Sequence, residues 1–393
     1  MKKLLFCASF FIILSGHLKA LDLTDINFKY LYDPINPFYI NKSVSCRGDT
    51  LLLKMFIELK GVAKSEDIGN LQFISQEDYD SEKHEVLEPL NIESTTKEKL
   101  LAIEASFLIS NQHNYFIAGL TYNGFEYFVE HAINKEAFFP CSNISFFKKN
   151  NSNKVLNTLI YPNDTVLFNE GMNVEHPMYI YRYENTFPPA LPPMTLKGTP
   201  QKSLKIDTLI IDSKVVSKQQ NWLYFVQSDS SSNRGVSFLS VESYFPKFKT
   251  PDELIEPLIY ICTKVEFDNM INADSKKTAF ESFWISKTNS QERARRAIRN
   301  FYRRVEHANR VFTSYKEGWK TDQGMIYIVH GLPDQISRTA TMERWVYHSS
   351  DGAIEYRFDK VANLFTQFHY ALQREKQSYK SWFREVANWR KGG

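Results

Sequence analysis

Two aspartates flank a short apolar run in the last third of the chain, and their placement could support acid–base chemistry. Asp322 precedes the apolar residues 325–329, and Asp334 follows them. Paired carboxylates can act as general acid and general base when they lie close together. We expect the apolar run to be a buried strand, because it is rich in β-branched and aromatic residues. A strand of that length would keep the two carboxylates apart, which favours turn and capping roles for both.

Three histidines in the same region could bind a metal ion. His330, His348 and His369 all fall on strands that we predict for one small sheet. Their spacing does not require a metal, since the sequence contains no His-x-His and no His-Glu-x-x-His. Partly buried structural histidines are the favoured interpretation, and we predict neither a metal nor a cofactor.

The sequence contains no assembled catalytic signature. Gly-x-Ser-x-Gly, Walker and dinucleotide-binding motifs are absent, although a Ser–His–Asp triad needs no local motif and stays open. The enzymatic hypothesis is a hydrolase of envelope polymers with its site near Asp322 and His330. It predicts a concave pocket there, with a perturbed histidine or carboxylate pKa. We favour a non-enzymatic role and assign no catalytic residue.

Arginines are concentrated on one predicted helix. A capping box at residues 288–291 begins this helix, which we expect to end near Lys316. The arginines could contact lipid headgroups, lipopolysaccharide or an acidic protein surface. The favoured alternative is a solvated helix face whose arginine stems cover the apolar stripe. The residues assigned to an anionic partner are Arg293, Arg296, Arg299, Arg303 and Arg304.

The stretch that connects this helix to the apolar run has the composition of a shaped loop. Two glycines bracket it and allow sharp turns, and its Thr and Asp side chains can bond nearby backbone N–H groups. A Gly-x-Pro-Asp turn ends the apolar run. We predict an interaction surface here, with core packing as the alternative for the tryptophans. The residues of this prediction are Gly318, Trp319, Thr321, Asp322, Gly324, Gly331, Pro333, Asp334 and Trp345.

Four separated motifs occur in the order typical of one known family. Residues 331–334 are similar to a Tyr-Gly-x-Pro-Asp turn, residues 343–347 to a Glu-Ile-Trp-Arg-Tyr strand, and residues 301–309 to the preceding helix. With the Gly-Trp-x-Thr-Asp motif, they resemble the GWxTD-domain family of Bacteroidetes envelope proteins. The residues that match the naming motif are Gly318, Trp319, Thr321 and Asp322.

The resemblance covers about the last third of the chain, from about Pro251 onward. His330 and Gln323 stand where the family usually has Tyr and Arg. If that Arg binds a ligand in the family, this chain lacks the contact. The resemblance implies no established activity.

The first twenty residues have the form of a secretory signal peptide. Lys2 and Lys3 precede the apolar residues 4–14, and Ala20 provides a small residue for cleavage. Cys7 lies inside the apolar run, so we do not expect lipidation. No later stretch reaches the roughly 18 apolar residues of a membrane span. We therefore expect a periplasmic or envelope-associated protein, with membrane contact limited to its periphery.

Composition and strand patterns predict a mixed, β-rich fold. Aromatic residues make up 15% of the chain, and the net charge of +3 argues against nucleic acid as a partner. We expect two tandem antiparallel β-sandwiches, followed by an α+β domain with a long helix and a small antiparallel sheet. The predicted boundaries are residues 1–20 for the signal peptide, 21–141 and 142–248 for the sandwiches, and 249–393 for the GWxTD-type domain.

Cysteines and prolines leave two further alternatives. An exported protein can form disulfides, and a Cys46–Cys141 bridge would close the first sandwich; unbridged thiols, with Cys262 also free, are the alternative. The proline-rich residues 187–193 resemble a ligand for aromatic grooves. An extended crossover between strands is the favoured interpretation.

The sequence thus predicts an exported binding or scaffolding protein. It would belong to an assembly in the periplasm or at the outer membrane and contact an envelope protein partner. The alternative is the envelope hydrolase described above. A third hypothesis is a glycan-binding protein that uses exposed aromatic residues.

Overall fold

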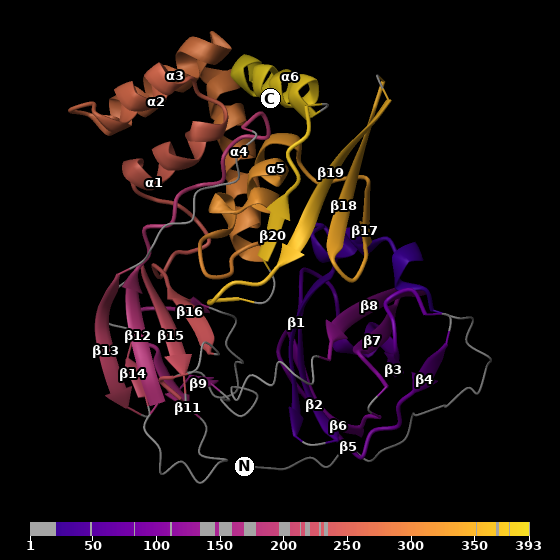
Figure 1. The fold of residues 1–393 in the computed structure, drawn as a ribbon. Coiled ribbons are helices and arrows are strands. Elements are labelled where there is room, and N and C mark those ends of the chain that lie inside the picture. The colour runs from indigo at the N-terminus through magenta and orange to yellow at the C-terminus, as the bar shows by residue number, and fades with distance from the viewer. Residues whose placement is uncertain are drawn as a thin grey trace. The chain divides into compact units, whose positions relative to one another are not determined.

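The computed structural model describes residues 21–393, apart from 48, 82, 111, 134–145, 149–158, 169–177, 196–204, 213, 217–220, 228, 232–234, 351, 367–368, 377 and 393. The fold is β-rich, with several antiparallel sheets and a group of helices (Figure 1). Contacts divide the chain into two compact units. The first holds residues up to 26 and 36–138, and the second holds residues 27–35 and 139–393.

The first unit contains two antiparallel sheets that share one core. Their strand orders are β1-β2-β6-β5 and β4-β3-β7-β8. Phe107 and Phe116, from different sheets, lie in the common apolar cluster. Asn123 and Gly124 both have positive φ and form the hairpin turn between β7 and β8. The elements are η1 Leu23–Asp25, β1 Phe38–Arg47, β2 Thr50–Leu59, η3 Ser65–Asp67, β3 Ile68–Gln76, β4 His84–Val86, β5 Asn91–Lys97, β6 Leu100–Leu108, β7 Tyr115–Tyr122 and β8 Phe125–Ala132.

The second unit begins its own β region with a five-stranded and a three-stranded sheet. Their orders are β10-β16-β15-β12-β13 and β14-β11-β9, and only the β10–β16 pair among these described pairings is parallel. One face of the larger sheet packs with Val166 of β11, and the other packs with Tyr315 and Phe365 from later in the chain. The strands are β9 Phe146–Lys148, β10 Leu159–Ile160, β11 Thr165–Phe168, β12 Met178–Glu184, β13 Ile206–Asp212, β14 Lys214–Val216, β15 Trp222–Gln227 and β16 Val236–Ser240.

Helices follow this β region within the same unit. The long arginine-bearing helix, α4, has Ser290 as its N-cap and ends at Val311, not near Lys316. The capping box predicted at residues 288–291 was wrong, because Thr288 is the last residue of the preceding helix. The preceding helix, α3, is capped by Ser275. The elements are η2 Phe28–Leu31, α1 Pro251–Ile255, η5 Glu256–Tyr260, α2 Lys264–Ile271, α3 Lys276–Thr288, α4 Gln291–Val311, η6 Gly318–Lys320, α5 Asp322–His330 and α6 Ser378–Lys391.

The apolar run at residues 325–329 is a helix, so the predicted strand was wrong. These residues form most of α5, which packs against α4, α6 and β20 (Figure 1). Because α5 is buried on nearly all sides, its sequence is continuously apolar and shows no helical period. The preceding Thr321-Asp322 pair is a helix-start signal that the strand interpretation overlooked.

A four-stranded antiparallel sheet completes the unit, with the order β17-β18-β19-β20. Residues 343–347, expected to form a strand, lie within β18, and the strands predicted for His348 and His369 are confirmed as β18 and β20. The strands are β17 Gln335–Arg338, β18 Met342–Ser349, β19 Gly352–Val361 and β20 His369–Leu372.

Several sequence predictions fall outside what the structure tests. The signal peptide and the Cys46–Cys141 bridge lie outside the described residues, while the Cys262 thiol is free and half-buried. Burial raises the pKa of that thiol to about 12. None of the described helices combines the length and apolar character that a membrane span requires. Contacts join residues 139–248 to the later residues in one unit, so the boundary at 248 stays a prediction.

Candidate functional site

The signature stretch folds into a tight turn that joins α4 to α5. Thr321 is the N-cap of α5: its Oγ1 accepts a hydrogen bond from Gly324 N at 2.9 Å and donates one to Gly318 O at 2.7 Å. A Cβ atom on Gly324 would lie 1.8 Å from Gly318 O, and one on Gly318 would lie 1.9 Å from Ala308 O. Neither glycine has a positive φ. These positions need glycine because backbones touch there, and not because of the sharp turns we expected.

The two tryptophans lie in separate aromatic clusters. Trp319 packs against Tyr260 at 6.1 Å between ring centroids, and its backbone N–H donates to Asn309 Oδ1 at 3.0 Å. Trp345 packs against Tyr32 at 5.6 Å. Both indoles are at most 1% exposed. Core packing, the alternative in our sequence interpretation, therefore describes both.

The predicted interaction surface is mostly interior. Of its nine residues, only Asp334 is exposed, and the other eight are buried. They lie in or beside the signature turn, α5 and β18, and pack against the surrounding residues of the unit. A partner therefore cannot contact this set directly, and the prediction of a shaped surface was wrong. The buried residues are Gly318, Trp319, Thr321, Asp322, Gly324, Gly331, Pro333 and Trp345.

Asp322 connects α5 to the end of the sheet. Its Oδ2 accepts a hydrogen bond from Leu372 N at 3.0 Å, and its Oδ1 pairs with Arg374 Nη2 at 2.7 Å. Both charged side chains are about 5% exposed. Its position in the first turn of α5 is favourable for a negative charge, but its bonds are to the segment after β19 and not to the helix end. The predicted turn or capping role was therefore wrong for Asp322.

Asp334 lies at a bend just before β17, and its carboxylate contacts β18. Its Oδ2 accepts a hydrogen bond from His348 N at 2.7 Å and lies 3.4 Å from His348 Nδ1. The backbone N–H of His348 is the main reason that the pKa of Asp334 is lowered. The contact fixes the start of β17 against β18.

Asp322 and His330 do not form a common site. They are the first and last residues of α5, and a nine-residue helix spaces its ends by about 12 Å. His330 is largely buried and its Nε2 lies 2.7 Å from the hydroxyl of Tyr356. Burial, reinforced by Arg304, lowers the pKa of His330 to about 3. The catalytic pair expected for a hydrolase is therefore not assembled.

The three candidate metal-binding histidines also lie apart in their contacts. His330 ends a helix, His348 pairs with Asp334, and the ring of His369 packs against Tyr315 at 5.5 Å. The prediction that all three lie on strands of one sheet was wrong for His330, which belongs to α5. Among the described residues, no three His, Cys, Asp or Glu side chains converge where they could hold a metal ion.

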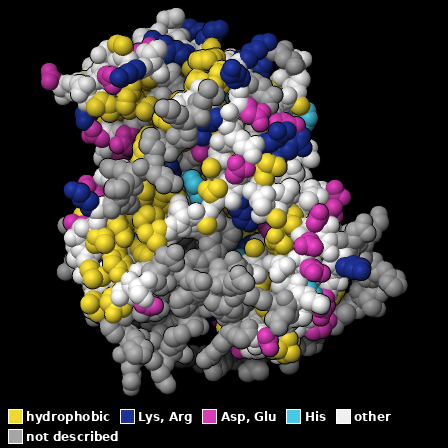
Figure 2. Space-filling model, viewed as in Figure 1, with side chains coloured by type: hydrophobic (Ala, Val, Ile, Leu, Met, Phe, Trp, Pro, Cys, Tyr) yellow, Lys and Arg dark blue, Asp and Glu magenta, His cyan; other side chains and the backbone are white. Residues whose placement is uncertain are grey.

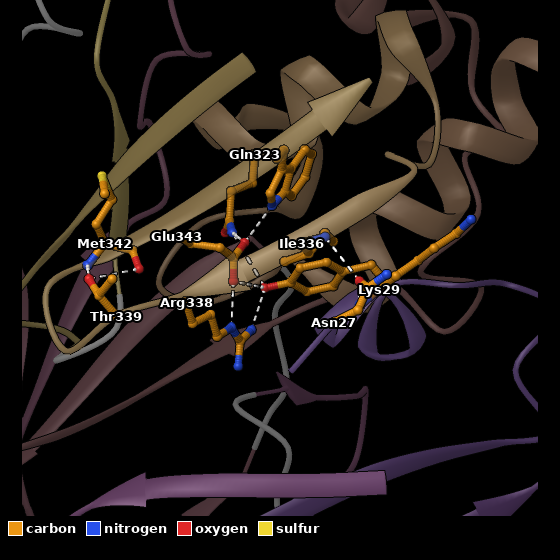
Figure 3. Close-up of polar contacts among 10 residues, drawn as sticks. Asn27, Lys29, Gln323, Ile336, Arg338, Thr339, Met342 and Glu343 are labelled. Atoms are coloured by element: carbon orange, nitrogen blue, oxygen red, sulfur yellow. Dashed lines mark hydrogen bonds and ion pairs between the residues drawn. The ribbon is translucent and has the colours of Figure 1, made fainter. Parts of the chain in front are cut away.

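A buried carboxylate that sequence reasoning missed forms the most connected polar centre of the unit. Glu343 is 0% exposed, and Figure 3 shows Gln323 and Arg338 reaching it from opposite sides. It accepts hydrogen bonds from Trp345 Nε1 at 2.6 Å, Gln323 Nε2 at 2.7 Å and Tyr32 OH at 2.9 Å. Arg338 Nε pairs with it at 2.7 Å. The sequence signal that could have identified Glu343 is its spacing of two residues from Trp345, which places both side chains on the same, buried face of β18.

The Glu343 centre fastens a segment from the beginning of the chain. We call residues 27–35 the N-terminal segment; they belong to the second unit although the first unit follows them. His307 Nε2 lies 2.7 Å from Tyr32 O, and Asn27 Oδ1 accepts a hydrogen bond from Ile336 N at 3.0 Å. Burial raises the pKa of Tyr32 well above its ordinary value. The segment thus supplies part of the core of a domain that lies about 300 residues later.

A family model described as a GWxTD domain matches residues 222–391. Residues 222–391 therefore form a GWxTD domain. No curated protein matches the chain. The match begins at β15, so it extends further toward the N-terminus than the start near Pro251 that we expected. The N-terminal segment lies outside the matched range, although it packs on the GWxTD domain.

Most arginines of the GWxTD domain have fixed partners. Arg338 and Arg374 pair with buried carboxylates, and Arg390 binds both oxygens of Glu266 at 2.7 and 2.8 Å. Arg304, which we had assigned to an anionic partner, instead donates to the carbonyls of Ile328 and Val329 at the end of α5. It is part of the interior, so that assignment was wrong.

The other arginines assigned to an anionic partner are exposed on α4. Among the described residues, none of them makes an ion pair within 4.0 Å. Spacings of three and four residues place Arg296, Arg299 and Arg303 on one helix face. We call these three residues the arginine row. The exposed arginines of the prediction are Arg293, Arg296, Arg299 and Arg303.

Proposed function

We propose that the protein is an exported binding or scaffolding protein of the cell envelope, whose GWxTD domain contacts an acidic partner protein through the arginine row of α4. The proposal includes two tandem β-sandwiches, of which the second shares β15 and β16 with the matched domain. The signal-like residues 1–20 support export. The position of Asp322 and His330 at opposite ends of α5 favours the binding role over the hydrolase alternative.

The contrast between the two groups of arginines carries the proposal. Arg338, Arg374 and Arg390 each have a carboxylate within 2.7 Å, whereas the arginine row is exposed and unpaired among the described residues. Lys and Arg side chains also gather over the helical part of the unit on the face shown in Figure 2. Unpaired guanidinium groups at regular spacing favour an external anionic surface.

The chemistry of α4 favours a protein over a lipid surface. A helix that lies in a membrane interface inserts its apolar face among the lipids. The apolar face of α4 is already buried, with Ala297, Phe301 and Val305 at most 1% exposed. Planar guanidinium groups bind carboxylates through two parallel hydrogen bonds. The row spans about 10 Å, a distance that several Asp or Glu side chains on one partner element can match.

The test is crosslinking in cells, followed by affinity purification and mass spectrometry. We compare the wild type with the variant Arg296→Glu/Arg299→Glu/Arg303→Glu, and we expect one specific envelope partner to be lost. The control Lys83→Glu/Lys97→Glu/Lys264→Glu changes the net charge equally at other exposed positions. It should retain the partner.

Two outcomes would overturn the proposal. A partner that survives reversal of the arginine row would show that the row is only a solvated face. A full-length, unprocessed protein that remains in the cytoplasm would refute export. Circular dichroism of both variants confirms that the fold is intact, because exposed substitutions change stability by only about 0.5 kcal/mol.

A further inference from the structure

A proline-rich segment packs against the signature turn of the GWxTD domain. We call residues 187–194, Phe-Pro-Pro-Ala-Leu-Pro-Pro-Met, the proline segment. It has neither helix nor strand structure until a turn at Pro193 and Met194. Proline fixes φ and has no N–H, so four prolines in eight residues favour the polyproline II conformation before the turn, in which Thr195 N donates to Pro192 O at 2.9 Å.

The domain binds this segment through carbonyls that recur every third residue. Arg374 Nη2 donates to Leu191 O at 3.0 Å, and Tyr379 OH donates to Met194 O at 2.9 Å. The ammonium group of Lys316 lies 3.5 Å from the carbonyl of Pro188. A polyproline II helix has three residues per turn, so carbonyls three residues apart lie along one face. This periodicity applies to the carbonyls of Pro188 and Leu191, whereas the carbonyl of Met194 belongs to the turn that follows. Side chains from three separate parts of the domain therefore contact carbonyls of the segment.

A second face of the segment supplies the apolar contacts. Ala190 and Pro193, again three residues apart, are buried. The ring of Phe187 meets Tyr315 edge to face, with 4.8 Å between centroids. The N–H of Ala190 donates to the carbonyl of Lys320, the variable residue of the GWxTD motif, at 2.9 Å. The signature turn thus forms part of the binding surface through its backbone.

Asp322 holds the central donor in position. Its ion pair with Arg374 uses the same Nη2 atom that donates to Leu191 O. Arg374 Nη1 also donates to Leu372 O at 3.1 Å, which fixes the plane of the guanidinium group. Asp322 is therefore a positioning residue for recognition of the segment.

We infer that the GWxTD signature builds a receptor groove for a proline-rich segment in the polyproline II conformation. In this chain the groove is filled by its own proline segment, and the same groove binds a peptide of that sequence supplied in trans. The groove lies on contacts of the signature turn and β20, so the inference does not depend on the arginine row.

The experiment measures peptide binding to the full-length protein. A fluorescein-labelled peptide of residues 185–195 is titrated by fluorescence anisotropy against the wild type and against Pro188→Gly/Pro189→Gly/Pro192→Gly. The glycines weaken the internal segment by raising its flexibility. The internal segment competes with the peptide, so the apparent affinity equals the intrinsic affinity multiplied by the fraction of protein whose groove is open. The glycine variant should have a larger open fraction, and we expect it to bind the peptide at least about tenfold more tightly than the wild type.

Matched controls separate recognition from non-specific association. A peptide with all four prolines replaced by alanine should bind at least about tenfold more weakly. Adding Tyr379→Phe to the glycine variant removes one donor and should weaken binding about fivefold. Adding Asp322→Asn should weaken it further, and Asp322→Glu should restore part of the binding. If the folded glycine variant does not bind the peptide, or binds the alanine peptide equally well, the inference is overturned.

Discussion

Two buried carboxylates of the GWxTD domain fasten segments from outside the matched range, and they do so by different means. Glu343 accepts the hydroxyl of Tyr32, a side chain of the N-terminal segment, at 2.9 Å. Asp322 acts through Arg374, which donates to the backbone carbonyl of Leu191 in the proline segment. The first contact requires one particular side chain. The second requires only a carbonyl in the correct place.

The N-terminal segment is therefore bound through a specific side chain, whereas the proline segment is bound at Leu191 through its backbone. Tyr32 places its ring beside Trp345 and Phe312 at 5.6 and 4.9 Å, so its shape and its hydroxyl are both used. At the Asp322 centre, the recognised groups are main-chain atoms that most sequences can supply. We expect substitutions in the N-terminal segment to cost more stability than substitutions in the proline segment.

The largest expected effect is at Glu343. Glu343→Gln leaves Arg338, which is 10% exposed, without its carboxylate, and removal of one partner of a buried ion pair costs about 3–5 kcal/mol. Urea unfolding measures the loss. The control Glu355→Gln breaks two ion pairs, with Arg344 and Arg357, whose shared carboxylate is 24% exposed, and should cost at most about 1 kcal/mol. Equal losses in the two variants would show that the buried Glu343 contributes no more to stability than the partly exposed Glu355.

Asp322→Asn should have a smaller effect. Asparagine retains an acceptor for Leu372 N, and Arg374 keeps its two carbonyl acceptors, so we expect a loss of about 2–3 kcal/mol. Hydrogen exchange locates the damage: Ala190 N–H should exchange faster, and residues 27–35 should be unchanged. Glu343→Gln should give the reverse pattern. Faster exchange of both segments in either variant would mean that the two centres open together.

Tyr32→Phe tests the binding of the N-terminal segment more gently. It retains the ring and removes the hydroxyl that bonds Glu343, for an expected loss of about 1–3 kcal/mol. A double-mutant cycle with Glu343→Gln should give a coupling energy of at least about 0.5 kcal/mol. Simple additivity would show that the hydroxyl does not depend on Glu343.

Acid should weaken the Asp322 centre through His369. Burial, reinforced by Lys316, lowers the pKa of His369 to about 4, compared with about 6.5 in an unfolded chain. Between these values the unfolded state binds more protons. The free energy of unfolding therefore falls as pH falls, by at most about 1.4 kcal/mol per pH unit from this group. Urea titrations at pH 7 and pH 5 measure the slope, and His369→Asn should make it shallower. An unchanged slope would contradict this assignment.

The smallest effect should come from Pro189→Ala. The substitution retains every carbonyl that the domain binds and mainly raises the entropy of the unfolded chain, for a loss of about 0.4–1 kcal/mol. A thermal melt of the purified variant suffices to measure it. A loss as large as that of Tyr32→Phe would show that this segment, too, is recognised by its side chains.

Local patterns in the sequence predicted a large part of the fold. The Asn123-Gly124 hairpin and strands β18 and β19 follow from turn chemistry and alternating residues. Residues 325–329 were misassigned because a helix buried on all sides has the same continuous apolar composition as a buried strand.

The candidate site was much harder to predict. The sequence analysis named Asp322 as a candidate site residue but could not predict its contacts. Its partner Arg374 lies 52 positions away, and no local pattern links the two. Glu343 was overlooked because Tyr32, one of its partners, lies 311 positions earlier. Long-range pairs of this kind depend on tertiary packing. The hydrophobic periods of strands and helices, about two and 3.6 residues, do not predict which distant residues come into contact.

The docking of the N-terminal segment has a consequence for biosynthesis. Tyr32 leaves the ribosome early, whereas Glu343, Trp345 and β19 are made near the end of translation. The core of the second unit therefore cannot form until Glu343 has been synthesised. Until then Tyr32 lacks its hydrogen-bond partner. Long-range closure of this kind slows folding. Completion of the GWxTD domain thus requires both residues 27–35 and the strand that carries Glu343.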